Sequence, residues 1–580
     1  MFKKSTLTMA VLLAASQLTA CSSDDDDDTT PTTQNAAPTA IQLSATTVNE
    51  NALGVMIGDL SATDTDSGDT FTFTTSDERF VISGSELSLA ENVSFDFEKE
   101  TSTTFSVTVT DSANNTFSQD VTLSVTDTHV NLDDVTATYD FGDSVSYSGQ
   151  VARHLLILEL TNYIGSGLQE DLDADKFDTR QDVLDALMAL YKTTDEGYET
   201  ELGQRALTVS TLVEAKQKTL SEISSSKKDL SGKIAGNDEK GQHKDWSAEF
   251  VAFGDKGSMS PEALIEHFLG KIADNAEKFI MGETRTDVLG GDIAKVYLDS
   301  NGLDYKQLVQ KVLLGAVTFS QGADDYLDDD TEGKGLLADH TALKDGKNYT
   351  NLEHQYDEGF GYFGAAVNYL AYNDNEISSK VASDEDGRAD WNGNHDTNGD
   401  GEIDLTSEYN WGQSVNAAKR DRGTASNTNP TDLTQTTMQA FLEGRKIIND
   451  NAGMALTDDQ MAALLEQRDI AVDGWERAIA ATVVHYINDT RADLANLGTA
   501  DFNYEDTAKH YSEMKGFALG FQFSPFSKIS DEDFQKIHDL MGNKPELDAA
   551  KVDAYRADLL EARDIIQAAL SFDAENVENW

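Results

Sequence analysis

Cysteine and basic residues are scarce in this sequence of 580 residues, and each scarcity excludes a class of protein. Cys21 is the only cysteine, so no disulfide framework can form and the domains must be held by ordinary cores or bound metal. Lysine and arginine number 44 against 104 acidic residues, which gives a formal net charge of −60. Such a surface repels nucleic acid and favours cations, so we expect no nucleic-acid partner.

Long apolar runs and a common hydrolase motif are also missing. The apolar run from Leu7 to Leu18 is interrupted by Ser16 and Gln17 and is too short to span a bilayer. No His-Glu-x-x-His string occurs, although zinc hydrolases use that spacing to place two histidines and a base on one helix face. We therefore expect a noncatalytic protein rather than an enzyme.

The first residues carry a pattern for export and lipidation. Two lysines precede the apolar run, and Leu18-Thr19-Ala20-Cys21 ends it. This arrangement resembles the signal peptide and lipobox of bacterial lipoproteins, in which the cysteine receives the lipid. The resemblance implies a signal peptide over 1–20 and a membrane anchor at Cys21. Because Ser22 rather than aspartate follows, it also implies location at the outer membrane of the cell envelope.

Residues 21–38 are predicted to form a disordered, acidic tether. The run from Asp24 to Asp28 is five like charges in succession, which repel one another and stay hydrated. From 39 to 130 the pattern changes to strict alternation, as in Phe105, Val107 and Val109. Short alternating runs separated by Ser, Asp, Gly and Asn clusters predict antiparallel strands of a small all-β sandwich.

The acidic turns of this sandwich resemble the calcium-binding motifs of cadherin repeats, a family with an immunoglobulin-like fold. The motifs are Val48-Asn-Glu-Asn51, Ala62-Thr-Asp-Thr-Asp66, Asp96-Phe-Glu98 and Val109-Thr-Asp111. The resemblance implies calcium ligands at Glu50, Asp64, Asp66, Asp96, Glu98 and Asp127. Calcium needs six to eight oxygens, which carboxylates on converging loops supply. The alternative is that acidic residues simply occupy the turns.

Residues 131–580 show helical periodicity and predict one large all-α domain of packed bundles. Ser260 and Pro261 predict a helix start, with serine as the cap and proline in the first turn. The expected helices include Val151–Tyr163, Leu308–Phe319, Met438–Ile448, Trp475–Ile487, Tyr511–Phe521 and Ala554–Leu570. The predicted fold is thus multidomain, a β-sandwich followed by a helical-bundle domain.

Three segments of the helical domain resemble a family of bacterial lipoproteins with a domain of unknown function, DUF4856. They are 346–364, which contains Asn351-Leu-Glu-His-Gln-Tyr-Asp-Glu-Gly359, then 396–410 and 441–446. The family is distantly similar to imelysin-type helical envelope proteins, which are tied to iron uptake and are sometimes classed as metallopeptidases. Their Gly-x-His-x-x-Glu motif is altered here, because Leu352 and Asp357 replace its glycine and glutamate.

Histidine and carboxylate pairs at helical spacing offer a transition-metal site for zinc or iron. Residues three or four apart share a helix face, so His354 can act with Asp357 or Glu358, and His510 with Glu513. His485 would add a third nitrogen. The alternative is that these are ordinary buried hydrogen-bond pairs.

A second calcium-like pattern lies in the helical domain at 396–408. Its oxygen-bearing residues follow the spacing of an EF-type loop, with Gly401 at the sharp turn. The predicted ligands are Asp396, Asn398, Asp400, Glu402, Asp404 and Glu408. Glu408 stands one residue beyond the position of the usual closing glutamate. The alternative is a hydrophilic turn.

These patterns favour a calcium-binding, membrane-anchored envelope lipoprotein that acts as a noncatalytic binding or adhesion module. Its partners would be the membrane and another surface protein. The alternative is an imelysin-like accessory protein for iron or heme uptake beside a TonB-type receptor. A divergent metallopeptidase is the least favoured reading.

Overall fold

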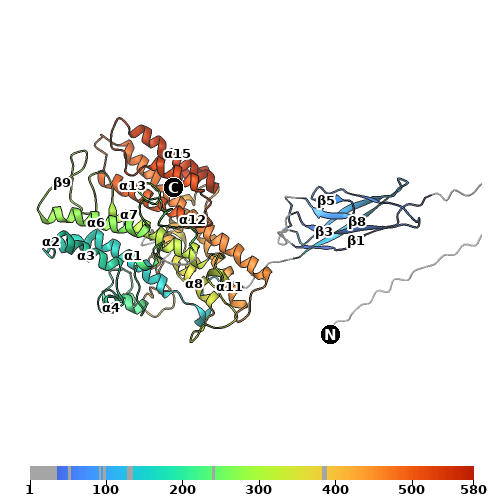
Figure 1. Ribbon diagram of the computed structural model, residues 1–580, viewed down its shortest axis with the longest axis horizontal. Helices are drawn as coiled ribbons and strands as arrows, with labels where there is room; N and C mark the ends of the chain where they lie inside the picture. The colour runs from blue at the N-terminus through green and yellow to red at the C-terminus, as the bar shows by residue number, and fades with distance from the viewer. Residues whose placement is uncertain are drawn as a thin grey trace, which may run out of the picture. The chain divides into compact units, whose positions relative to one another are not determined.

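The computed structural model describes residues 35–49, 54–90, 93–95, 100–126, 135–237, 242–381 and 388–580. The chain divides into two compact units, residues 1–128 and 129–580. The first is built of strands and the second mostly of helices (Figure 1). This confirms the predicted order of a β domain followed by a large α domain.

The first unit contains two four-stranded sheets that share one core. Its strands are β1 (Ala40–Leu43), β2 (Thr47–Asn49), β3 (Met56–Thr63), β4 (Thr72–Thr75), β5 (Phe80–Ser83), β6 (Glu86–Leu89), β7 (Ser102–Thr110) and β8 (Thr116–Thr126). One sheet has the order β1-β3-β6-β5 and the other β2-β8-β7-β4. Leu87 from the first sheet and Val107 and Leu123 from the second are fully buried in the shared core. The alternating residues therefore face inward, as their spacing predicts.

One strand pairing differs from the expected antiparallel pattern, since β2 runs parallel to β8. The chain leaves β1 of one sheet and enters β2 of the other within a few residues. It therefore keeps its direction while it changes sheets, and β2 meets the last strand in parallel.

The second unit is a set of packed helices around one continuous core. Its helices are α1 (Ser148–Asn162), α2 (Leu168–Asp173), α3 (Arg180–Tyr191), α4 (Asp195–Thr200), α5 (Leu220–Ile223), α6 (Pro261–Ile280), α7 (Tyr305–Leu313), α8 (Asn351–Phe363), α9 (Asp374–Ile377), α10 (Gly412–Thr424), α11 (Leu433–Asp450), α12 (Asp458–Ala495), α13 (Tyr504–Ala518), α14 (Asp531–Met541), α15 (Val552–Leu570) and α16 (Ala574–Asn579). A two-stranded hairpin, β9 (Arg285–Thr286) with β10 (Asp292–Ile293), follows α6. Of the helices described, none is long and apolar enough to cross a membrane.

The helix at Pro261 begins as predicted, because the Ser260 hydroxyl accepts a hydrogen bond from Ala263 N at 3.2 Å. Two expected helices end differently. Past Leu313 the chain enters a wider π-helical turn (Leu314–Phe319), and past Ala518 a 3-10 turn (Leu519–Phe523). The longest helix, α12, packs against α10, α11, α13 and α15, so it forms the axis of the unit.

A buried ion pair joins α8, α11 and the segment before α1. The Arg445 side chain is fully buried, and its Nε lies 2.8 Å from Asp357 Oδ1 while Nη1 lies 3.3 Å from Glu353 Oε1. Its Nη2 donates to Ser144 Oγ at 2.8 Å. Tyr139 OH also donates to Asp357 Oδ1 at 2.9 Å. The guanidinium is thus hydrogen-bonded along its whole fork, which compensates its burial.

Arg445→Met is expected to destabilise the helical unit by about 3–5 kcal/mol, because it leaves two buried carboxylates without their cation. The matched control is Lys446→Met, since Lys446 pairs only with the more exposed Asp450 of its own helix. That change is expected to alter stability by less than about 1 kcal/mol. Chemical denaturation followed by circular dichroism measures both. Equal effects of the two substitutions would contradict the assignment.

Candidate functional site

Three aspartates from two loops of the β unit converge. Asp64 and Asp69 lie between β3 and β4, and Asp111 lies between β7 and β8. One carboxylate oxygen from each lies within 4.8 Å of the other two. In the part of the chain that the structure describes, no other three His, Cys, Asp or Glu side chains are gathered so closely.

Two asparagines, Asn35 and Asn115, are hydrogen-bonded to this acidic cluster and to each other. The Asn115 amide donates to Asp111 Oδ2 at 2.9 Å and to Asn35 Oδ1 at 2.9 Å. Asn35 in turn donates to Asp69 Oδ2 at 2.8 Å. The Asp64 Oδ2 atom is buried and has no hydrogen-bond partner among the described residues. Burial raises the pKa of Asp111, but hydrogen bonds from Asn115 and Ala113 outweigh it and lower that pKa, so the carboxylate stays ionised.

The structure places one of the predicted calcium ligands of this domain in the cluster. Asp64 belongs to the cluster, whereas Asp66 Oδ2 instead accepts a hydrogen bond from Ala36 N at 2.5 Å. Glu50, Asp96, Glu98 and Asp127 lie outside the described residues. Asp69 was not predicted, and Asp111 was recognised only as part of a cadherin-like turn. The signal that both share is an acidic residue in a loop between two strands.

The loop at 396–408 is folded around its own carboxylates. Asp396 Oδ1 accepts from Gly399 N at 2.7 Å, and Oδ2 accepts from Gly401 N at 2.8 Å. Buried Glu408 accepts from Thr397 N at 2.9 Å and from Asp404 N at 2.8 Å. Asn398 and Asp400 accept main-chain bonds two residues further on, Asp400 N and Glu402 N. The predicted ligand side chains thus hold the turn together, and calcium at this loop stays a prediction.

A neighbouring segment is docked on this loop. Ile403, which is almost fully buried, forms a parallel bridge with Ala215. Ile403 N donates to Glu214 O at 3.0 Å, and Lys216 N donates to Ile403 O at 2.8 Å. The Lys216 ammonium lies 3.3 Å from Asp404 and 4.0 Å from Asp400. A lysine of the same chain therefore supplies positive charge to the acidic loop.

The predicted histidine site at α8 is divided between different partners. His354 Nδ1 lies 3.1 Å from Ser146 O, and its Nε2 lies 3.7 Å from Glu358 Oε2. Asp357 points instead to the buried Arg445 and Tyr139. Burial raises the pKa of Asp357, against the lowering effect of Arg445. Asp357 is therefore part of the ion pair that joins α8 to α11.

The second predicted group is also divided. His510 Nδ1 lies 2.8 Å from Asp493 Oδ2, and Glu513 lies 3.4 Å from Lys311 Nζ. His485 Nε2 and His510 Nε2 approach the same Asp489 oxygen at 3.4 and 4.0 Å. Both histidines therefore lie near the carboxylate of Asp489, whereas Glu513 is paired with Lys311. Among the described residues, His485, His510 and Asp489 nevertheless do not form a set in which all three ligand atoms lie within 4.8 Å of one another.

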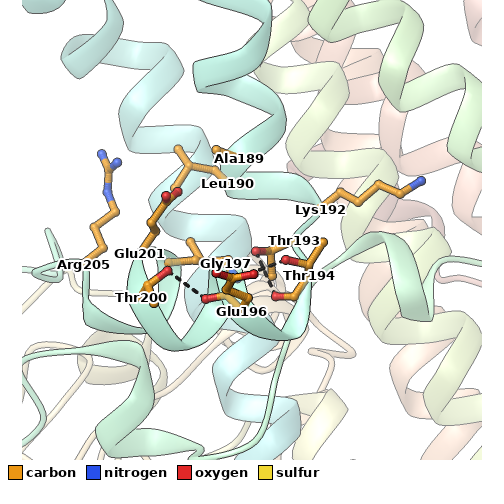
Figure 2. Close-up of a pocket in the computed structure, with 11 residues that line it drawn as sticks. Ala189, Leu190, Lys192, Thr193, Thr194, Glu196, Gly197, Thr200, Glu201 and Arg205 are labelled. Atoms are coloured by element: carbon orange, nitrogen blue, oxygen red, sulfur yellow. Dashed lines mark hydrogen bonds between the residues drawn. The ribbon is translucent and has the colours of Figure 1, made fainter.

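A hollow of about 780 Å³ lies where α3 leads into α4. Figure 2 shows Lys192 and Arg205 extending away from each other at its two sides. The Thr194 hydroxyl accepts from Gly197 N at 3.0 Å, and the Thr200 hydroxyl donates to Glu196 O at 2.8 Å. Figure 2 draws these bonds as dashed lines; Thr194 caps the start of α4, and Thr200 bonds back within the helix.

A smaller cavity of about 420 Å³ contains two buried basic groups that sequence patterns did not reveal. Lys515 is 1% exposed and His538 is 4% exposed, and both line it together with Asp539. The Lys515 ammonium has one long hydrogen bond, 3.4 Å to His538 O. Burial lowers the pKa of Lys515 to about 7 and lowers that of His538 well below its ordinary value. A lysine on a helix gives no sequence signal of such burial.

Lys515→Met is expected to stabilise the protein most at low pH. The pKa of Lys515 is 10.5 when free and about 7 when folded, so the unfolded chain binds more protons between these values. The penalty of the lysine is therefore complete below pH 7 and disappears as the pH rises towards 10.5. We expect a gain of a few kcal/mol at pH 6 that shrinks by pH 9. Unfolding of both proteins at several pH values measures it. The exposed Lys509→Met on the same helix is the control, and a pH-independent gain would contradict the prediction.

Comparison with known proteins gives a family and little chemistry. A search of the curated proteins finds no match. The family model described as "Domain of unknown function (DUF4856)" matches residues 136–544, which is most of the helical unit and more than half of the chain. The chain belongs to the DUF4856 family.

Proposed function

We propose that this protein is a calcium-binding, noncatalytic binding or adhesion module, held at the bacterial outer membrane by lipid on Cys21. The observation that carries the calcium proposal is the convergence of Asp64, Asp69 and Asp111 in the β unit. Its binding partner would be another surface protein. The lipid anchor rests on the lipobox-like sequence, because Cys21 lies outside the described residues.

The chemistry of the acidic cluster favours calcium over softer metals. Its three side chains offer only carboxylate oxygens, and Asn35 lies next to them with a side-chain oxygen and a main-chain oxygen. Calcium accepts six to eight such oxygens in flexible geometry, whereas zinc and iron favour nitrogen or sulfur donors. The buried Asp64 oxygen without a hydrogen-bond partner is the group that a cation would compensate.

The arrangement of the helical unit supports a role without catalysis. Two of its predicted carboxylates are engaged in ion pairs that join helices, Asp357 with Arg445 and Glu513 with Lys311. The loop at 396–408 is the second place for calcium, where the ion would stiffen a turn already organised by Asp396 and Glu408.

Asp64→Asn is expected to weaken calcium binding to the β unit at least tenfold, or about 1.4 kcal/mol, because it removes one of three clustered charges. Isothermal titration of the full chain with calcium after chelator treatment measures it. The matched control is Asp120→Asn on β8, an exposed aspartate outside the cluster. We expect the control to titrate like the unchanged protein.

Calcium would also raise the unfolding temperature of the β unit, since a ligand that binds only the folded state stabilises it. Scanning calorimetry of the full chain, with calcium and with chelator, measures the shift. Unfolding that is identical in both conditions, or equal calcium affinity in the Asp64 and Asp120 variants, would reject this site.

Cys21→Ser is expected to release the protein from the membrane fraction of the producing bacterium. Without the thiol no acyl chains are attached, and each buried methylene contributes about 0.8 kcal/mol to anchoring. Fractionation and radioactive palmitate labelling measure the loss. Ser22→Ala, next to the same site, is the control and should remain in the membrane fraction. Retention of the Cys21 variant in the membrane would contradict the anchor.

A further inference from the structure

A buried arginine of α10 lies near α12. Arg420 is 7% exposed, and its Nε has no hydrogen-bond partner among the described residues. Within the described residues, no carboxylate lies within 4.0 Å of its guanidinium. Burial lowers the pKa of Arg420 to about 10. Burying a guanidinium costs free energy that an adjacent carboxylate usually compensates, and Arg420 has no such neighbour among the described residues.

The preceding residue adds a second cation of the same kind. Lys419 is half-buried and forms no ion pair with any described residue. Burial, and after it the positive charges of Lys311 and Arg420, lower its pKa to about 8. The charge of Lys380 acts in the same direction, whereas that of Glu513 opposes it. Two adjacent cations of α10 therefore have no ion-pair partner among the described residues.

The neighbouring helices do not supply the missing anion. On α13, Glu513 is paired with Lys311, and His510 is paired with Asp493 of α12. Asp489 of α12 attracts Arg420 electrostatically but lies against the two histidines instead. Burial lowers the pKa of His485 most. Together with the positive charges of Arg420, His510 and Lys419, it brings that pKa to about 3. His485 is therefore a neutral hydrogen-bonding group beside a positive centre.

The region is open to solvent on the side of α12 and α13. The side chains of His485, Asp489 and His510 are 29%, 37% and 19% exposed. On another side it is closed by Trp580, whose indole donates to Arg420 O at 3.0 Å. The Trp580 main-chain oxygen accepts from Asn488 at 3.0 Å. His485 and Asp489, which interact electrostatically with Arg420, are therefore partly accessible to solvent.

We propose that α10, α12 and α13 form a binding site for the oxyanion group, phosphate or carboxylate, of a small molecule. The guanidinium of Arg420 presents a planar fork that matches two oxygens of such a group, and Lys419 adds a point charge. His485 adds a neutral donor or acceptor. This site is independent of the calcium cluster, which belongs to the other unit.

The test compares inorganic phosphate, acetate and chloride at equal ionic strength, with the full chain. We expect phosphate or acetate, but not chloride, to raise the unfolding temperature, and titration calorimetry to give saturable binding. Arg420→Gln is expected to reduce the affinity at least about tenfold, because charge-assisted hydrogen bonds are lost. The matched control, Arg422→Gln, removes an exposed arginine two residues away on the same helix and should bind normally.

Unfolding without added anion separates the effect of Arg420 on binding from its effect on stability. Arg420→Gln removes an unpaired buried charge, so without added anion the variant should unfold at the same temperature as the unchanged protein or above it. Unfolding well below that temperature would show that Arg420 is already satisfied within the chain, and would overturn the proposal. Equal anion binding by both variants, or no binding by the unchanged protein, would overturn it as well. A response to phosphate alone or to acetate alone identifies which oxyanion the site takes.

Discussion

The ion pair between Arg445 and Asp357 is the constraint on which the helical unit depends. It is fully buried, and it joins α11 to α8 across 88 residues of chain. Glu353, its second carboxylate, also forms the capping box that begins α8, since Thr350 N donates to it at 2.7 Å. The start of one helix, the interior of another and the segment around Tyr139 are therefore fixed by one guanidinium. Replacing one member leaves charges that the interior cannot solvate.

The balance of charge explains how the other polar groups are used. With acidic residues in large excess, carboxylates are available at most turns, and many of them hold helix starts and loops by accepting main-chain N–H groups, as Asp396 and Glu408 do. Cations are few, and several are buried. Arg445 and Lys311 have carboxylate partners, whereas Lys419, Arg420 and Lys515 form no ion pair with any described residue. The distribution of partners, rather than the net charge, distinguishes structural cations from candidate binding groups.

Periodicity was sufficient to predict the fold class. Alternation in residues such as Val107 and Val109 places one face of β7 in the core, and apolar spacing in α6 and α12 places their buried faces, because these rules act within one element. The start of α6 at Ser260 was predictable for the same reason. The parallel pairing of β2 with β8 and the π-helical turn after α7 were not, since they depend on which segments meet in space.

The candidate sites also combine features that follow from the local sequence with features that depend on which segments meet in space. The resemblance to cadherin repeats implied Asp64 as a ligand, included Asp111 only as part of a motif and did not include Asp69. Their convergence could not be predicted, because the three carboxylates meet only after two loops fold together. Spacing also grouped His354 with Asp357 and His510 with Glu513, although long-range cations, Arg445 and Lys311, take the carboxylates. A helical interval states which side chains share a face. It does not predict which charged side chain from another helix will pair with the residues on that face.

The bridge between Ile403 and Ala215 links two parts of the chain that lie 188 residues apart. Each strand of the bridge gives one amide to the other, so neither can exchange its hydrogen with solvent unless the two segments separate. Opening of the acidic turn and release of the segment before α5 are consequently a single event. Deuterium uptake at Lys216 therefore reports on the rigidity of a loop far along the sequence, without any probe being attached to that loop.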